Sequence, residues 1–303
     1  MDILRIDTRP LLNKPIVICA FAGWNDAASA ATNAARFVVR RLGARRFASF
    51  DAEPLFEFTE TRPSVRITAR GEREITWPTN DFFYARNPTG PHDVVVFIGT
   101  EPGLHWGGFA REQATLFRDL EADVVLSLGA LLADVPHTRP VRVTGSAMRP
   151  ELNERYGLQP SRYEGPTGIV GVVHEALRAE GVASASFWAN VPHYITTSQN
   201  PPATAALLQR IQPIVGMEFD LSELETAGER FRIEVDTALS ANPEVKEYVN
   251  RLEEAFDGPV GDEAGAEAGE LPQGVDLVTD IEEFLRSQQR GDEDPGSAAD
   301  GQD

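Results

Sequence analysis

The chain has 303 residues, of which 42% are hydrophobic, and this is enough to bury one large core. Its net charge is −19, of which the segment 257–303 contributes −12 through 14 acidic residues and two arginines. The other residues carry −7, and this charge would still repel nucleic-acid phosphates and anionic lipids. Neither nucleic acid nor a membrane is therefore an expected partner. No apolar run reaches the roughly 18 residues that span a bilayer, and 1–10 has no apolar signal core, so we expect a cytoplasmic protein.

Strand and helix signals alternate over residues 1–215, which is the pattern of a sheet covered on both faces. The first strand signal is continuously apolar, as in a strand buried on both faces, and its Cys19 is predicted to be a small core residue without a disulfide partner. We expect parallel pairing among such strands. The predicted units are a strand at 16–22 with a helix at 27–42, a strand at 93–99 with a helix at 109–120, and an inner strand at 124–128.

Shorter β-prone pieces between the first two units predict antiparallel hairpins, and therefore a mixed sheet. The alternation then continues as far as Pro213. We therefore expect an α/β domain over 1–215, built as a three-layer α/β/α sandwich. Its further elements are predicted as strands at 65–68, 74–77, 82–85, 141–145 and 183–191 and helices at 168–180 and 203–212.

Residues 216–257 predict an appended hairpin of two helices, because apolar residues recur at helical spacing on both sides of Asn242-Pro243 and a proline can start a helix in its first turn. Such an apolar stripe can pack on its own domain or on another subunit, and both alternatives stay open. The residues predicted for an oligomer interface are Leu221, Leu224, Phe231 and Val235.

The segment 258–303 is acidic, and its first part is too poor in large apolar groups to offset the entropy of ordering. We expect a flexible tail there. A short helix is predicted within it at 279–289, where Ile281, Phe284 and Leu285 lie at helical spacing.

The turn after the first buried strand carries polar residues at the carboxyl end of the sheet, where open α/β folds bind ligands. Asn25 or Asp26 can also cap the following helix by accepting a backbone N–H of its first turn, with no ligand involved. Trp24 supplies apolar area at the same rim. Glu101 follows the next βα strand in the same way, so it could approach Asp26, and two carboxylates there could bind a cation or do acid/base work.

The five histidines are scattered without the HxxxH or HxH spacing of a metal site, so no metal site is predicted. His137 and Arg139 lie between prolines in a loop that could present them to an anion or to a neighbouring subunit. His193 follows Pro192 in a similar setting. For each histidine, a structural hydrogen bond is the alternative to catalysis.

The segment Gly165-Pro166-Thr167-Gly168 precedes a predicted helix, so its free N–H groups could hold a carboxylate or a phosphate. It lacks the P-loop lysine and the glycine spacing of a dinucleotide fold. The chain also has no GxSxG motif. No cofactor and no serine nucleophile are therefore predicted.

Several of these segments resemble family signatures. The stretch 21–27, Phe-Ala-Gly-Trp-Asn-Asp-Ala, resembles the N-terminal signature of the proteasome assembly chaperone family of the second-subunit type, and 165–171 resembles its central one. The stretch 136–141 resembles the mid-chain loop of actinobacterial members, and 188–194 with 200–204 resembles the stretch that follows the central signature. The chain is thus identified as a bacterial member of that family.

The resemblance covers about 16–256 and implies a phosphorylase/hydrolase-like fold and self-association, with a homotrimer favoured. Eukaryotic relatives assist assembly of the proteasome α-ring, so proteasome subunits are the class of partner that it implies. Those relatives dock through a C-terminal hydrophobic-Tyr-any tripeptide, whereas this sequence ends in Gly301-Gln302-Asp303. Some members are labelled carboxylate-amine ligases of the ATP-grasp type, but the sequence has no basic, glycine-rich nucleotide loop.

Two hypotheses of function follow. The first is a non-catalytic binding or assembly protein, and the second is a small-molecule enzyme or ligand-binding protein that uses the rim of the sheet. Geometry discriminates between them, because an enzyme needs its polar side chains to converge on one concave pocket. The rim residues are Trp24, Asn25, Asp26, Glu101, His137, Arg139, Gly165, Thr167, Gly168 and His193.

Overall fold

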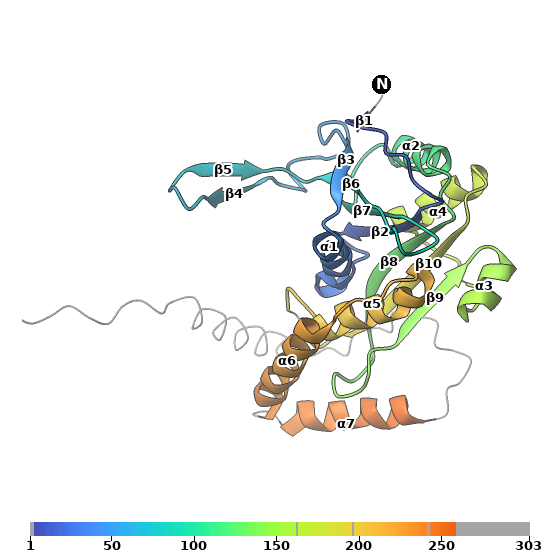
Figure 1. Cartoon of the computed structure of the whole chain (residues 1–303). Helices are drawn as coiled ribbons and strands as arrows, with labels where there is room; N and C mark the ends of the chain where they lie inside the picture. The colour runs from blue at the N-terminus through green and yellow to red at the C-terminus, as the bar shows by residue number, and fades with distance from the viewer. Residues whose placement is uncertain (1–2, 162, 196, 241–242, 259–303) are drawn as a thin grey trace, which may run out of the picture.

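The computed structural model describes residues 3–161, 163–195, 197–240 and 243–258 (Figure 1). The predicted tail lies outside these residues except for Gly258, and so does its predicted helix at 279–289. In the described ranges, no helix is long and apolar enough to cross a membrane.

The chain forms a mixed sheet whose eight strands are β1 (Leu4–Ile6), β2 (Ile16–Ala22), β3 (Arg45–Phe50), β6 (Asn80–Ala85), β7 (Val94–Thr100), β8 (Val124–Ala133), β9 (Val143–Ala147) and β10 (Ser184–Pro192). Their order in space is β1-β3-β6-β7-β2-β8-β10-β9. The four central strands β7, β2, β8 and β10 pair in parallel, whereas the strands on either side pair antiparallel. The carboxyl ends of the central strands therefore meet at one edge of the sheet.

Helices cover both faces of this sheet (Figure 1). A 3₁₀ turn, η1 (Ala27–Ser29), leads into α1 (Ala30–Leu42), which shares one face with α5 (Pro201–Val215). The other face carries α2 (Trp106–Asp119) and α4 (Ile169–Ala179). A short helix, α3 (Pro150–Tyr156), packs beside β9. The predicted three-layer α/β/α sandwich with a mixed sheet is confirmed.

The two faces have separate apolar cores because successive side chains of a strand point to opposite sides. Along β2, Ile16, Ile18 and Ala20 join the core under α1 and α5. Their neighbours, including Cys19 and Phe21, join the core under α2 and α4. Cys19 is fully buried, and this burial raises the pKa of its thiol, so it is a core residue without thiolate chemistry.

The structure corrects several predicted boundaries. The helix predicted to end before Pro213 continues to Val215, because a proline one turn before the helix end removes only one hydrogen bond, and Gly216 then ends the helix with φ +68°. Strands β1 and β3 and helix α3 were not predicted. Strand β3 begins with the exposed residues Arg45 and Arg46, and these two charges weaken the apolar pattern by which a strand is recognised in sequence.

Two strands predicted as hairpins of the mixed sheet form a separate sheet instead. Strands β4 (Ser64–Ile67) and β5 (Arg73–Thr76) pair only with each other, antiparallel, and stand clear of the main sheet (Figure 1). All eight of their residues are exposed. We call this pair the ribbon.

The helical hairpin is present as α6 (Ser222–Ser240) and α7 (Pro243–Asp257), with Pro243 in the first turn as predicted. Leu221 is buried in the core under α1 and α5, and Val235 is buried against residues of the chain such as Tyr194. These two residues therefore pack inside the protomer, which corrects their assignment to an oligomer interface. Leu224 and Phe231 are half-buried, and their place in an interface stays a prediction.

Candidate functional site

The loops that follow β2 and β7 lie against each other at the carboxyl edge of the sheet. Glu101 donates its backbone N–H to the carbonyl of Ala22, at 2.8 Å. Gly23 has φ +130°, and a Cβ there would lie 3.2 Å from the Cβ of Glu101. Glycine therefore permits both the turn and the close approach.

Asp26 caps α1 although it lies before the 3₁₀ turn that precedes this helix. Its carboxylate accepts the N–H of Ala31 at 2.7 Å, the N–H of Thr32 at 3.2 Å and the Thr32 hydroxyl at 2.6 Å. Burial raises the pKa of Asp26, against the opposing effect of these hydrogen bonds. The capping alternative predicted for Asp26 is realised, although the helix that it caps begins at Ala30.

Glu101 caps a different helix. Its Oε1 accepts the N–H of Ile169, the first residue of α4, at 2.8 Å and the side-chain amide of Asn25 at 3.1 Å. A Cβ on Gly168 would lie within 2.8 Å of the Asn25 amide, so a glycine is needed for this approach. The negative charge at the N-terminus of α4 is also favourable for the helix dipole. We call this set of contacts the Glu101 cap.

The Glu101 cap changes the interpretation of two predictions. The N-terminus of α4, expected to hold a carboxylate or a phosphate, holds a carboxylate of the chain itself. The two carboxylates expected to form a pair are directed to different helices, Asp26 to α1 and Glu101 to α4. Among the other residues of that segment, Thr167 Oγ1 donates to the carbonyl of Gly168, and Gly165 lies beside the Tyr163 ring.

Exposed apolar side chains lie on the loops that carry the Glu101 cap and at the end of β8. Trp24 adjoins Asn25, Leu104 follows Glu101 by three residues, and Tyr163 donates to the carbonyl of Pro166 just before α4. Leu132 lies at the carboxyl end of β8. Their exposed fractions are 70% for Trp24, 44% for Leu104, 64% for Tyr163 and 57% for Leu132. We call these four residues the strand-end surface.

Three of the five described non-glycine residues with positive φ lie at the same edge. Ala28, Ser29 and His105 have left-handed backbones with φ of 50°, 52° and 57°, which non-glycine residues seldom adopt. Such strain concentrates at functional sites because the surrounding structure must hold it in place. Of the four residues of the strand-end surface, only Trp24 was predicted from the sequence. Leu104 follows a buried strand closely, which is a usable signal, whereas Leu132 lies within β8 and Tyr163 lies in the loop after α3.

His137, Arg139 and His193 form a second group, farther along the sheet edge. Strands β8 and β10 run on past the end of β2, and this group lies beyond their ends, against α6 and α7. Among the described residues, no hydrogen bond or ion pair joins this group to the Glu101 cap. The predicted rim residues therefore fall into two sets.

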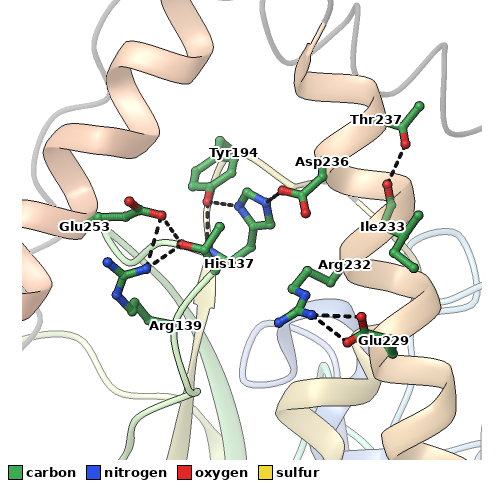
Figure 2. A network of polar contacts seen from close by, with 10 residues as sticks. His137, Arg139, Tyr194, Glu229, Arg232, Ile233, Asp236, Thr237 and Glu253 are labelled. Atoms are coloured by element: carbon green, nitrogen blue, oxygen red, sulfur yellow. Dashed lines mark hydrogen bonds and ion pairs between the residues drawn. The ribbon is translucent and has the colours of Figure 1, made fainter.

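His137 is held by a directed chain of hydrogen bonds. Tyr194 Oη accepts the backbone N–H of His137 at 2.9 Å and lies 2.7 Å from its Nδ1, and Nε2 lies 3.0 Å from Asp236 Oδ1 (Figure 2). All three contacts are satisfied when Tyr194 donates to Nδ1 and Nε2 donates to Asp236, which requires a neutral imidazole. Burial lowers the pKa of His137, despite the opposing charge of Asp236.

The neighbouring residues tie the same loop to α7. Arg139 pairs with Asp257 at 2.7 Å and with Glu253 at 3.3 Å, and Figure 2 shows Glu253 reaching from its helix toward Arg139. His193 contacts Asp134 at 3.1 Å and the hydroxyl of Tyr248 at 3.3 Å. The partners expected to be an anion or another subunit are thus acidic and aromatic groups of the chain itself. A cavity lined in part by His137 and Arg139 measures about 20 Å³, which is room for one water molecule.

The described residues thus form an α/β protein. At the carboxyl edge of its sheet, the Glu101 carboxylate occupies the N-terminus of α4, and large apolar side chains are exposed. The family model of the PAC2 family matches residues 20–239. Because this match spans most of the sequence, the chain belongs to the PAC2 family, and the resemblance found in the sequence is confirmed.

Solved structures agree with this assignment. The chain is 40% identical to a PAC2 family protein from Streptomyces avermitilis, with a TM-score of 0.71, covering 78% of this chain and 99% of that one. It is 38% identical to a proteasome-assembly chaperone homologue from Mycobacterium tuberculosis, with a TM-score of 0.70, covering 77% and 99%. An archaeal proteasome activator from Pyrococcus furiosus, at 18% identity, a TM-score of 0.63 and coverage of 77% and 97%, shares the fold alone. None of the curated proteins compared with the chain matches it.

Proposed function

We propose that the chain is a non-catalytic binding protein of the assembly-chaperone kind, and that it contacts its partner through the strand-end surface. The observation that carries the proposal is that four large apolar side chains are exposed at the ends of β2, β7 and β8 and in the loop before α4. Exposed apolar groups that cluster, rather than lie singly, mark contact surfaces. Tryptophan and tyrosine, represented here by Trp24 and Tyr163, are also the residues that most often dominate binding energy.

The state of the polar residues supports the same proposal. Asp26 and Glu101 are engaged by the backbones of α1 and α4, and His137 and Arg139 by acidic groups of α6 and α7. A general base or nucleophile needs to reach a substrate from a concave site. The alternative of a small-molecule enzyme has less support, because its candidate residues fall into two sets and are occupied by structural contacts.

Proteasome subunits are the partner class that we infer for this chain. The relative from Mycobacterium tuberculosis, named as a proteasome-assembly chaperone homologue, is similar over 99% of its length, which supports a common kind of partner. We further propose that the chain acts in the cytoplasm as a homo-oligomer, with a division into the α/β domain at 1–215, the helical hairpin at 216–257 and the tail at 258–303.

The proposal is tested by direct binding of the full chain to purified α-type and β-type proteasome subunits from the same organism. Replacing Trp24 by Asp should weaken binding about 30-fold or more, because a charge would enter a desolvated contact. Leu11→Asp is the matched control: Leu11 is 87% exposed and precedes β2, at the opposite edge of the sheet.

Two outcomes would contradict the proposal. If the wild-type chain binds neither type of subunit at micromolar concentration, proteasome subunits are not the partner. If Trp24→Asp and Leu11→Asp bind as tightly as the wild type, the strand-end surface is not the contact.

A further inference from the structure

The ribbon formed by β4 and β5 has one apolar face. Its register places Val65 opposite Ile75 and Ile67 opposite Arg73, and Trp77 continues that side of β5. Val65, Ile67, Ile75 and Trp77 are 46–64% exposed. The other face is polar, with Ser64 opposite Thr76 and an ion pair between Arg66 and Glu74 at 2.6 Å.

Such an arrangement is only marginally stable by itself in water. A two-stranded hairpin is marginal alone, and strands become independently stable only with a third strand or with packing against another element. Figure 1 shows the ribbon projecting away from the described part of the chain, and it shares no sheet with another strand. Within the chain, the ring contact between Phe58 and Trp77, with centroids 5.0 Å apart, supports only the base of the ribbon.

A cover that is present whenever the protein is folded would stabilise the ribbon. A transient partner would leave four large apolar side chains in water for much of the time, with the aggregation risk of an exposed strand edge. A second copy of the same chain is always available at the concentration of the protein itself. This argument favours self-association over a passing partner.

Charge complementarity points to a binding surface on the second copy, formed by its α6 and α7, which we call the seat. In a chain of net charge −19, the segment 60–77 has four arginines and three glutamates and is slightly basic. The helices α6 and α7 carry ten acidic and four basic side chains. Apolar surface is available there too, because Ile233 on α6 is 55% exposed and Phe231 is half-buried.

We propose that the apolar face of the ribbon packs on the α6–α7 hairpin of a second copy of this chain. The contact joins two different surfaces and is therefore head-to-tail, which generates a ring when the rotation closes. It rests on the homo-oligomer proposed above and specifies its interface, and it uses none of the strand-end surface, so its failure would leave the proposed partner contact intact.

Sedimentation velocity on the full chain tests the proposal. The wild type should sediment as an oligomer at micromolar concentration. Ile67→Asp should raise the dissociation constant about 30-fold or more and give a folded monomer, because the new carboxylate enters a desolvated contact. Within the monomer it faces Arg73, so the ribbon itself is preserved. Thr76→Asp adds the same charge to the polar face and should leave the oligomer intact.

A mixing experiment identifies the seat. Ile233→Asp should also be monomeric, since it places a charge on the exposed surface of α6 while leaving the ribbon unchanged. An equimolar mixture of Ile67→Asp and Ile233→Asp should form a heterodimer, because each pair retains one intact ribbon and one intact seat.

Three results would overturn the proposal. A monomeric wild-type chain would remove the second copy as occupant. Retention of the oligomer by Ile67→Asp would exclude the ribbon face from the contact. A mixture that stays monomeric would exclude the hairpin as the seat, and circular dichroism on each variant ensures that these results come from folded protein.

Discussion

Replacing Glu101 by Ala should destabilise the protein, because this carboxylate links three segments that are distant in sequence. Its Oε1 accepts from Asn25 at 3.1 Å and from the N–H of Ile169 at 2.8 Å. The variant removes this shared acceptor, and with it both hydrogen bonds, and leaves the amide of Asn25, which is only 3% exposed, without its partner. A matched variant, Glu101→Gln, keeps an acceptor oxygen and removes only the charge.

The magnitude follows from these contacts. Loss of an N-terminal cap costs about 0.5 to 2 kcal/mol, and a buried donor left unsatisfied costs about 1 to 3 kcal/mol. Allowing for overlap between the two effects, Glu101→Ala should lose about 2 to 4 kcal/mol. At about 2 to 4 °C per kcal/mol, that corresponds to a fall of roughly 4 to 16 °C in the thermal midpoint. Glu101→Gln should lose less than about 1 kcal/mol, the net value of a typical hydrogen bond.

Urea unfolding at neutral pH, followed by far-UV circular dichroism, measures both variants against the wild type. The reasoning would be refuted by a gain of stability in Glu101→Ala. Such a gain is typical of a carboxylate that function holds in an unfavourable place, and it would return Glu101 to the list of catalytic candidates.

Two further predictions concern buried polar groups. His174 lies between Ser127 and Ser184, and burial lowers its pKa to about 4, so the folded chain binds this proton less readily than the unfolded chain. The neutral imidazole of His174 therefore contributes on the order of 3 kcal/mol to the free energy of unfolding, fully above about pH 6.5 and progressively less as the pH falls toward 4. Unfolding curves across this pH range should show the loss. In His174→Gln the free energy of unfolding should depend less on pH over the same range. Tyr194→Phe removes the hydroxyl that contacts His137 twice, so it should cost about 1 to 3 kcal/mol and speed amide exchange in α6 and α7; unchanged exchange there would contradict the role given to this contact.

The sequence predicts the elements whose patterns are local. The run that becomes β2 is apolar throughout because both faces of the strand are covered, and α7 begins at Pro243, as expected. Pro213 shows the limit of such rules, since a helix packed along its length tolerates one lost hydrogen bond near its end. The alternation in β4 and β5 predicts strands, but not that they leave the main sheet.

The candidate site could be predicted only in part, because its contacts depend on tertiary placement. Asn25 and Glu101 both follow strands, so their common edge is predictable. The choice of helix is not, since Glu101 meets α4 through the register of β7 beside β2 and through the close approach at Gly168. Likewise, Asp236 lies 99 residues from His137 in sequence, and no local pattern pairs them.

Hydrogen–deuterium exchange on the full chain, alone and with a bound proteasome subunit, tests the central claim most directly. We expect slower exchange in the peptides that carry Trp24, Leu104 and Tyr163, since amides at a covered surface are protected. Peptides around Leu11, at the opposite edge of the sheet, should exchange as in the free chain. Protection confined to α6 and α7, with the strand-end peptides unchanged, would contradict the claim that this edge of the sheet is the partner-binding surface.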